Sequence, residues 1–132
     1  MRSRVLAGSL LSFLLLTGVA LAGSPKPGQL YTSEYLTVTV AKPAKSVKVF
    51  VECLPNTGGG AQWTGKIALK HGSFKIDSKQ TLSKLPKGKF KGTVDVTGSF
   101  KGGAFKGTWQ LGGTACGKTS YVAKSGGGGT GY

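Results

Sequence analysis

The chain has 132 residues, of which 18 are Lys or Arg and only four are Asp or Glu, so its formal net charge is +14. A chain of this length can build one core of ordinary size, which excludes a large multidomain enzyme. With one His, two Cys and four acidic residues, it also offers few groups for catalysis or metal binding.

The first 22 residues have the three parts of a Sec-type signal peptide. Arg2 and Arg4 form a basic start, an apolar run follows over residues 5–19, and Ala20-Leu21-Ala22 is a small-residue cleavage site. This pattern is typical of exported proteins and is too short and too polar for a membrane-spanning helix. We therefore expect a secreted or extracytoplasmic protein without a transmembrane segment in the mature chain.

The remaining chain is expected to form one β domain over residues 23–124, followed by a flexible Gly-rich tail over residues 125–132. Apolar residues recur at every second position from Leu36 to Val40 and again from Val47 to Cys53. A period of two predicts strands, and Pro43 between the runs predicts that residues 42–45 connect them.

Two hairpins are predicted from register. A turn at His71-Gly72 would place Leu69 opposite Phe74 and Ile67 opposite Ile76, with Lys66 and Asp77 as a cross-strand pair of opposite charge. His71 is interpreted as a turn residue, because His tolerates a positive φ better than most residues.

A second hairpin is indicated by the similarity between residues 90–98 and 105–113, with Gly102-Gly103 as the turn. This register places Phe100 opposite Phe105, Val96 opposite Trp109 and Val94 opposite Leu111 on one face, and Thr97 opposite Thr108 and Asp95 opposite Gln110 on the other. Four glycines then face inward, and either aromatic side chains cover them or they line a ligand cavity: Gly92, Gly98, Gly107 and Gly113.

A last strand is expected near residues 118–124. Together the runs predict an all-β protein, with an antiparallel β-sandwich of about seven strands as the first choice and a small up-and-down β-barrel as the alternative. Cys53 and Cys116 are the only cysteines, and an exported chain meets an oxidising compartment, so they are expected to form a disulfide.

From Ser73 to Lys124 the order of Gly-rich hairpin, late cysteine and closing aromatic strand resembles small secreted bacterial β-rich proteins of unknown function. That resemblance implies a fold and no activity. Residues 103–109 also look similar to strand motifs of avidin-type barrels, although the biotin-contacting residues of that family are not recognisable here.

The chemical inventory points away from an enzyme. His71 is the only imidazole, both cysteines are expected to be bonded, and the acids are spread over separate segments: Glu34, Glu52, Asp77 and Asp95. No catalytic residue, metal site or cofactor is predicted. The segment 54–58 matches the LPxTG sorting signal, but half the domain follows it instead of an apolar segment, so it is interpreted as a turn.

The lysine excess is the feature with functional content. Lys91, Lys101 and Lys106 are expected to point outward and to contact a polyanion such as an anionic polysaccharide of the envelope. The mature chain has no arginine for bidentate recognition, so sequence-specific nucleic-acid binding is not expected. Trp63 is a candidate for an exposed aromatic contact with a ligand. The other interpretation is that its side chain is buried in the core. Binding of an extracellular protein and carriage of a small ligand in a barrel are the alternative functions, and solubility alone could also account for the lysines.

Overall fold

The computed structural model describes residues 24–56 and 58–125, so the expected signal peptide and most of the expected tail lie outside the described residues. Each of the eight strands is antiparallel to its neighbours in the chain. Their bounds are β1 Leu30–Thr32, β2 Leu36–Val40, β3 Ser46–Cys53, β4 Ala61–Ala68, β5 Ser73–Lys84, β6 Lys89–Lys101, β7 Ala104–Leu111 and β8 Thr119–Ser125. No α-helix is assigned within these residues, and none of their segments is a helix able to span a bilayer.

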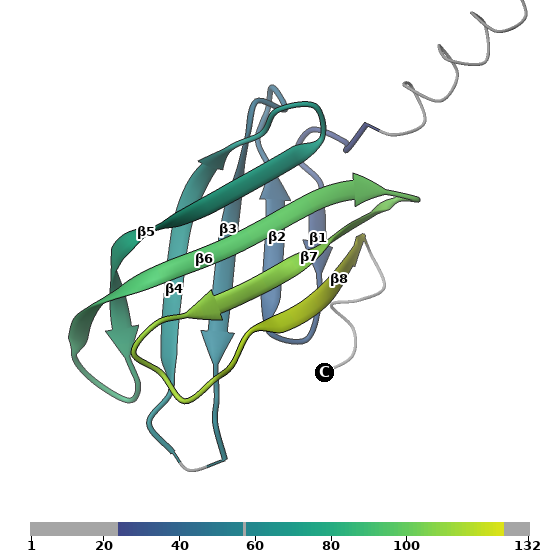
Figure 1. Ribbon diagram of the computed structural model, residues 1–132. Coiled ribbons are helices and arrows are strands. Elements are labelled where there is room, and N and C mark those ends of the chain that lie inside the picture. The colour runs from purple at the N-terminus through teal and green to yellow at the C-terminus, as the bar shows by residue number, and fades with distance from the viewer. Residues whose placement is uncertain (1–23, 57, 126–132) are drawn as a thin grey trace, which may run out of the picture.

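The strands close in sequence order into an up-and-down barrel. The expected sandwich is therefore wrong, and the alternative is confirmed. The barrel nevertheless resembles a sandwich, because it consists of two four-stranded halves, β1–β4 and β5–β8, joined by two short seams. Each seam has two residue pairs, between β1 and β8 and between β4 and β5. In Figure 1 β6 and β7 run obliquely in front of the more upright β2 and β3, as two packed layers would.

The β6–β7 hairpin has the predicted register. Val94 pairs with Leu111, Val96 with Trp109 and Phe100 with Phe105, while the hydroxyls of Thr97 and Thr108 lie 3.3 Å apart on the outer face. Gly102 and Gly103 both have positive φ, as a tight turn requires. The register could be predicted from the sequence because a shift of one residue would have moved every apolar side chain outward.

The His71-Gly72 turn is also confirmed, with φ values of 52° and 75° and reciprocal hydrogen bonds between Lys70 and Ser73. The predicted register beyond it is wrong. After the bridge between Lys70 and Ser73, β5 leaves β4 and rejoins it only where Ala61 pairs with Lys84 and Gln62 with Ser83. Closing the strands along their whole length would bury polar groups, because Ser78 and Gln80 lie on the inner face of β5.

The interior is filled by side chains from both halves. Phe105 lies at its centre, with its ring 5.1 Å from Tyr31 and Phe100 and 5.6 Å from Phe74. At the end of the barrel that holds the β3–β4 and β7–β8 connections, Cys53 and Cys116 form the expected disulfide, with Cα atoms 6.0 Å apart. Because Cys53 ends β3 and Cys116 lies between β7 and β8, the bond ties the two halves together.

Candidate functional site

The three lysines singled out from the sequence do not form one site. Lys91, Lys101 and Lys106 are all exposed on the outer face of the β5–β8 half, as expected. However, Lys91 and Lys101 are separated along β6 by ten residues, or about 33 Å in a strand. The structure therefore divides them between two groups.

The first group, here called the hairpin-end cluster, surrounds the β5–β6 connection and consists of Lys79, Lys84, Lys87, Lys89 and Lys91. Lys91 lies opposite Thr81 and Lys79 opposite Thr93, so these two lysines are diagonal neighbours about 7–8 Å apart. No acidic residue occurs between positions 78 and 94. All five side chains are exposed, and none forms an ion pair with any described residue.

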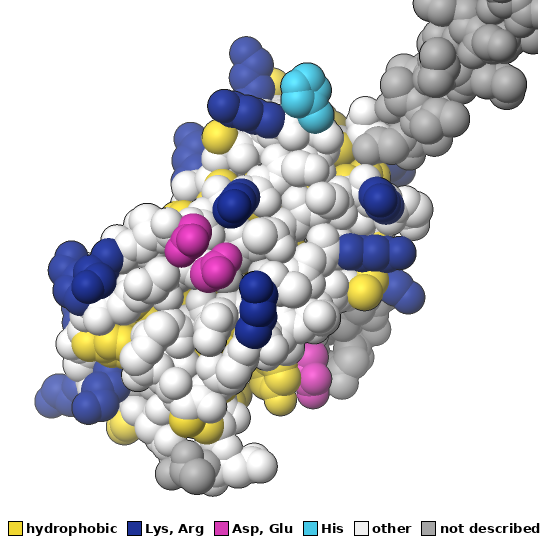
Figure 2. Space-filling view, viewed as in Figure 1, with side chains coloured by type: hydrophobic (Ala, Val, Ile, Leu, Met, Phe, Trp, Pro, Cys, Tyr) yellow, Lys and Arg dark blue, Asp and Glu magenta, His cyan; other side chains and the backbone are white. Residues whose placement is uncertain are grey.

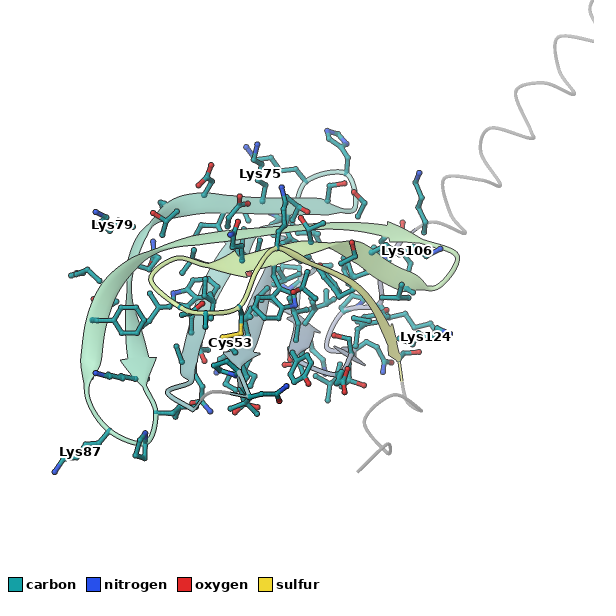
Figure 3. The ribbon with its side chains drawn as sticks, turned by 60° about the horizontal axis from the view of Figure 1, so that its bottom comes forward. Cys53, Lys75, Lys79, Lys87, Lys106 and Lys124 are labelled. Carbon is teal, nitrogen blue, oxygen red and sulfur yellow. A yellow bond between two sulfur atoms is a disulfide. The ribbon has the colours of Figure 1, made fainter. Side chains whose placement is uncertain are left out.

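The second group, the turn-end cluster, consists of Lys101, Lys106 and Lys124. Lys101 and Lys124 both lie opposite Ala104, on either side of β7, and Lys106 is the next outward residue of that strand. Figure 3 shows Lys79 and Lys87 toward one end of the barrel and Lys106 and Lys124 toward the other.

Two pairs of like charge lie on the outer wall where an opposite-charge pair was expected. Lys66 pairs with Lys48 rather than with Asp77, and Asp77 pairs with Asp95. Figure 2 shows two adjoining acidic side chains on the front face. Like charges directly opposite each other destabilise a sheet, so the predicted Lys66–Asp77 pair is replaced by two unfavourable ones.

Trp63 is not an exposed contact. It lies on the inner face of β4 with 5% of its surface exposed, because β4 begins at Ala61 and its alternation places Ala61, Trp63 and Ile67 inward. Its indole ring covers Gly65, where a Cβ atom would overlap the ring. The exposed aromatic contact is therefore wrong, and the other interpretation of Trp63, burial in the core, is confirmed.

Other groups of the protein fill the space beside the inward glycines, so these glycines do not line a cavity. Phe74 and the Tyr121 hydroxyl lie where a Cβ of Gly98 would be, Phe90 and the Gly112 backbone lie against Gly92, and the Thr97 carbonyl lies against Gly107. Gly113 lies beyond the end of β7 and is exposed, so its expected inward position is wrong. Aromatic covering is confirmed for Gly98, by Phe74, and for Gly92, by Phe90.

Tyr121 explains an interruption between β6 and β7. The ladder omits the pairs of Thr97 with Thr108 and Gly98 with Gly107. Instead the Tyr121 hydroxyl donates to the Thr97 carbonyl at 2.7 Å, and the Thr108 amide donates to the Thr97 hydroxyl at 3.1 Å. Burial raises the pKa of Tyr121 above its ordinary value of 10.0.

The disulfide end of the barrel carries two neighbouring cavities, of about 210 and 250 Å³, which share Tyr35, Trp109 and Thr119 in their walls. The rings of Tyr35 and Trp109 are 6.5 Å apart and nearly edge to face. One cavity also contacts Glu34 and the other Glu52, whose carboxylate accepts a hydrogen bond from Gln62 at 2.7 Å. Sequence reasoning missed this site, since Tyr35 and Trp109 are 74 positions apart and carry no shared motif.

No metal-binding group of three or more His, Cys, Asp or Glu side chains is present in the part of the chain that the structure describes. Comparison with protein-family models, with curated proteins and with solved structures gave no match for this chain.

Proposed function

We propose that this protein is a non-enzymatic, exported binding domain that contacts anionic polymers of the envelope or the extracellular space through the hairpin-end cluster. The observation that supports the proposal is the concentration of five exposed lysines around one strand connection with no acidic residue among them. Neighbouring ammonium groups at this spacing repel one another, and a polyanion relieves the repulsion while it releases its own counterions.

Lysine also defines what kind of recognition to expect. An ammonium group is a compact charge without the planar fork of arginine, so it does not select a particular phosphate or sulfate geometry. Affinity should therefore follow the charge density of the polymer rather than its sequence or sugar identity. Neutral glucans should bind weakly or not at all.

The test compares two variants with equal loss of charge. Lys79, Lys89 and Lys91 are replaced by Gln in one, and the turn-end lysines Lys101, Lys106 and Lys124 in the other. Binding to a heparin-like glycan, teichoic acid and DNA is measured at several salt concentrations. The first variant should bind more weakly and show a salt slope smaller by about 2–3, whereas the second should change less.

Equal losses in the two variants would mean diffuse attraction without a site. An affinity that does not depend on salt would refute the electrostatic proposal altogether, since counterion release must weaken binding as salt rises.

Small-ligand binding is a second candidate function, supported by the two cavities beside Tyr35 and Trp109. Their aromatic walls with carboxylates nearby suit a small ligand that has an apolar body. An apolar dye that binds there should raise the melting temperature, and a Tyr35→Ala variant should lose that effect. A dye that stabilises both proteins equally would place its site elsewhere.

A further inference from the structure

The seam between β4 and β5 leaves two strand edges without partners. All eight residues of β4 pair with β3, and β5 pairs with β6 from Ser73 to Ser83. Between β4 and β5, the strand pairs stop at Gln62 and Ser83. The facing edges of residues 63–68 and 74–81 therefore carry backbone N–H and C=O groups that no neighbouring strand of the described chain satisfies.

The inner face of β5 is polar and open along this seam. Ser78 and Gln80 lie on the same face of β5 as Ile76 and Leu82, at every second position, yet Ser78 is exposed and Gln80 is half-buried. Their side chains hydrogen-bond to each other at 2.8 Å. On the β4 side, the Trp63 ring over Gly65 keeps the interior closed, so the seam is open to solvent without exposing the core.

A groove of about 340 Å³ lies at the end of the seam next to the His71-Gly72 turn. Ile67 and Phe74 form its apolar floor, and Lys70 and Lys75 line it. Lys66 lies outward on the free stretch of β4, beside Lys48 on β3. Asp77 is the acidic residue of the free stretch of β5. Its cross-strand neighbour Asp95 is on β6, on the side of β5 away from β4.

We propose that the β4–β5 seam binds an extended, acidic peptide segment of another protein, which adds as a strand along the free edge of β5. Unpaired strand edges attract a further strand, because main-chain hydrogen bonds supply affinity while alternate side chains supply specificity. Acidic side chains on the outward face of the added strand would contact Lys66 and Lys75. An apolar side chain at one end would enter the groove over Ile67 and Phe74.

Charge complementarity selects this occupant over a second copy of the chain. A copy of this chain would bring its own lysines, with 18 basic residues against four acidic ones, to a seam that is already basic. The free edge of β5 includes Lys79 of the hairpin-end cluster. The proposed side-chain contacts, Lys66 and Lys75, lie outside that cluster, so the peptide site and the polymer site can be tested separately.

The experiment measures amide hydrogen exchange by NMR on the folded protein. The probe is a synthetic peptide of about eight residues with alternating Glu and Val and blocked ends, a length that matches the free edge. Exchange of the alternate amides in residues 74–81 that point away from β6 should slow at least tenfold when the peptide is bound, because the other amides of this stretch already face β6. A peptide of the same sequence with N-methyl groups on alternate residues, which cannot form one row of hydrogen bonds, should give no slowing.

Side-chain contacts are tested with a double variant, Lys66→Gln with Lys75→Gln, and a matched control, Lys106→Gln with Lys124→Gln. The first should lower peptide affinity by roughly tenfold, because two exposed charge contacts are lost, and the control should change it about twofold or less. Circular dichroism verifies that both variants fold.

Three results would overturn the proposal. The first is no peptide binding, which would mean that the lysines only prevent other strands from pairing with this edge. The others are equal binding by the N-methylated peptide, or slower exchange confined to amides outside β4 and β5. A heparin-like glycan is the reference for the polymer site. If the glycan binds while the peptide does not, this inference fails and the proposed function stands. If the peptide binds while the glycan does not, the reverse holds.

Discussion

The Tyr121 hydroxyl provides the sharpest test of how the barrel wall is held together. Replacing Tyr121 by Phe keeps the ring and removes one oxygen, which lies beside Gly98. The lost hydrogen bond, 2.7 Å to the Thr97 carbonyl, lies where the β6–β7 ladder is interrupted, so the carbonyl has no strand partner there to replace it. This acceptor is partly buried, and leaving it unsatisfied costs about 1–3 kcal/mol.

For a domain of this size, such a loss corresponds to a decrease in melting temperature of about 5–15 °C. The measurement is thermal and urea unfolding followed by circular dichroism, with the disulfide intact. Tyr31→Phe is the matched control, because the Tyr31 hydroxyl accepts a longer hydrogen bond of 3.2 Å from the amide of the exposed residue Lys26. Water can replace that acceptor, so the control should lose about 1 kcal/mol or less.

A Tyr121→Phe variant as stable as the Tyr31→Phe variant would refute the reasoning. It would mean that the Thr97 carbonyl finds another donor once the hydroxyl is gone. An unchanged β6–β7 register in the variant, verified by NMR, is needed for the comparison to be valid.

Three further predictions concern pH, the disulfide and the barrel wall. Because burial raises the pKa of Tyr121 above 10.0, the unfolded chain loses this proton first. The stability that the protonated Tyr121 hydroxyl contributes should therefore be complete below pH 10 and be lost as pH rises further. The free energy of unfolding of Tyr121→Phe should fall less steeply above pH 10 than that of the unchanged protein, and parallel curves would contradict this. Replacing Cys53 and Cys116 by Ala should lower the free energy of unfolding by about 4 kcal/mol, as the chain-entropy model gives for a loop of 63 residues, and a loss below about 1 kcal/mol in chemical denaturation would contradict it. Gly65→Val should displace the Trp63 indole, shift its fluorescence to longer wavelength and cost about 1–3 kcal/mol, whereas Gly117→Ala, with open space around it, should have no effect on either measurement.

Local patterns in the sequence were sufficient for much of the fold. The alternation in residues 36–40 and 47–53 predicted β2 and β3, and the turns at His71-Gly72 and Gly102-Gly103 were located from register. These features depend on neighbours close in the chain, where a period of two and a positive φ leave a direct mark on residue choice.

The site was predictable only in part. An outward direction for Lys91, Lys101 and Lys106 followed from alternation, but their division into two clusters depends on distance along β6 and on pairing across three strands. For Trp63, burial in the core and an exposed aromatic contact were both weighed, and burial is confirmed, because the alternation of β4 places this side chain inward.

An all-β chain, two hairpin turns, one disulfide and an outer wall rich in lysine followed from residue patterns alone. The tertiary structure was needed to choose between sandwich and barrel, because alternation is the same in both and closure depends on two seams of two residue pairs each. It also decided that β4 and β5 separate, since the polar pair Ser78 and Gln80 gains nothing from burial. Pairing between strands far apart in the chain is selected by the packing of the whole interior, and that selection leaves no periodic mark on either strand alone.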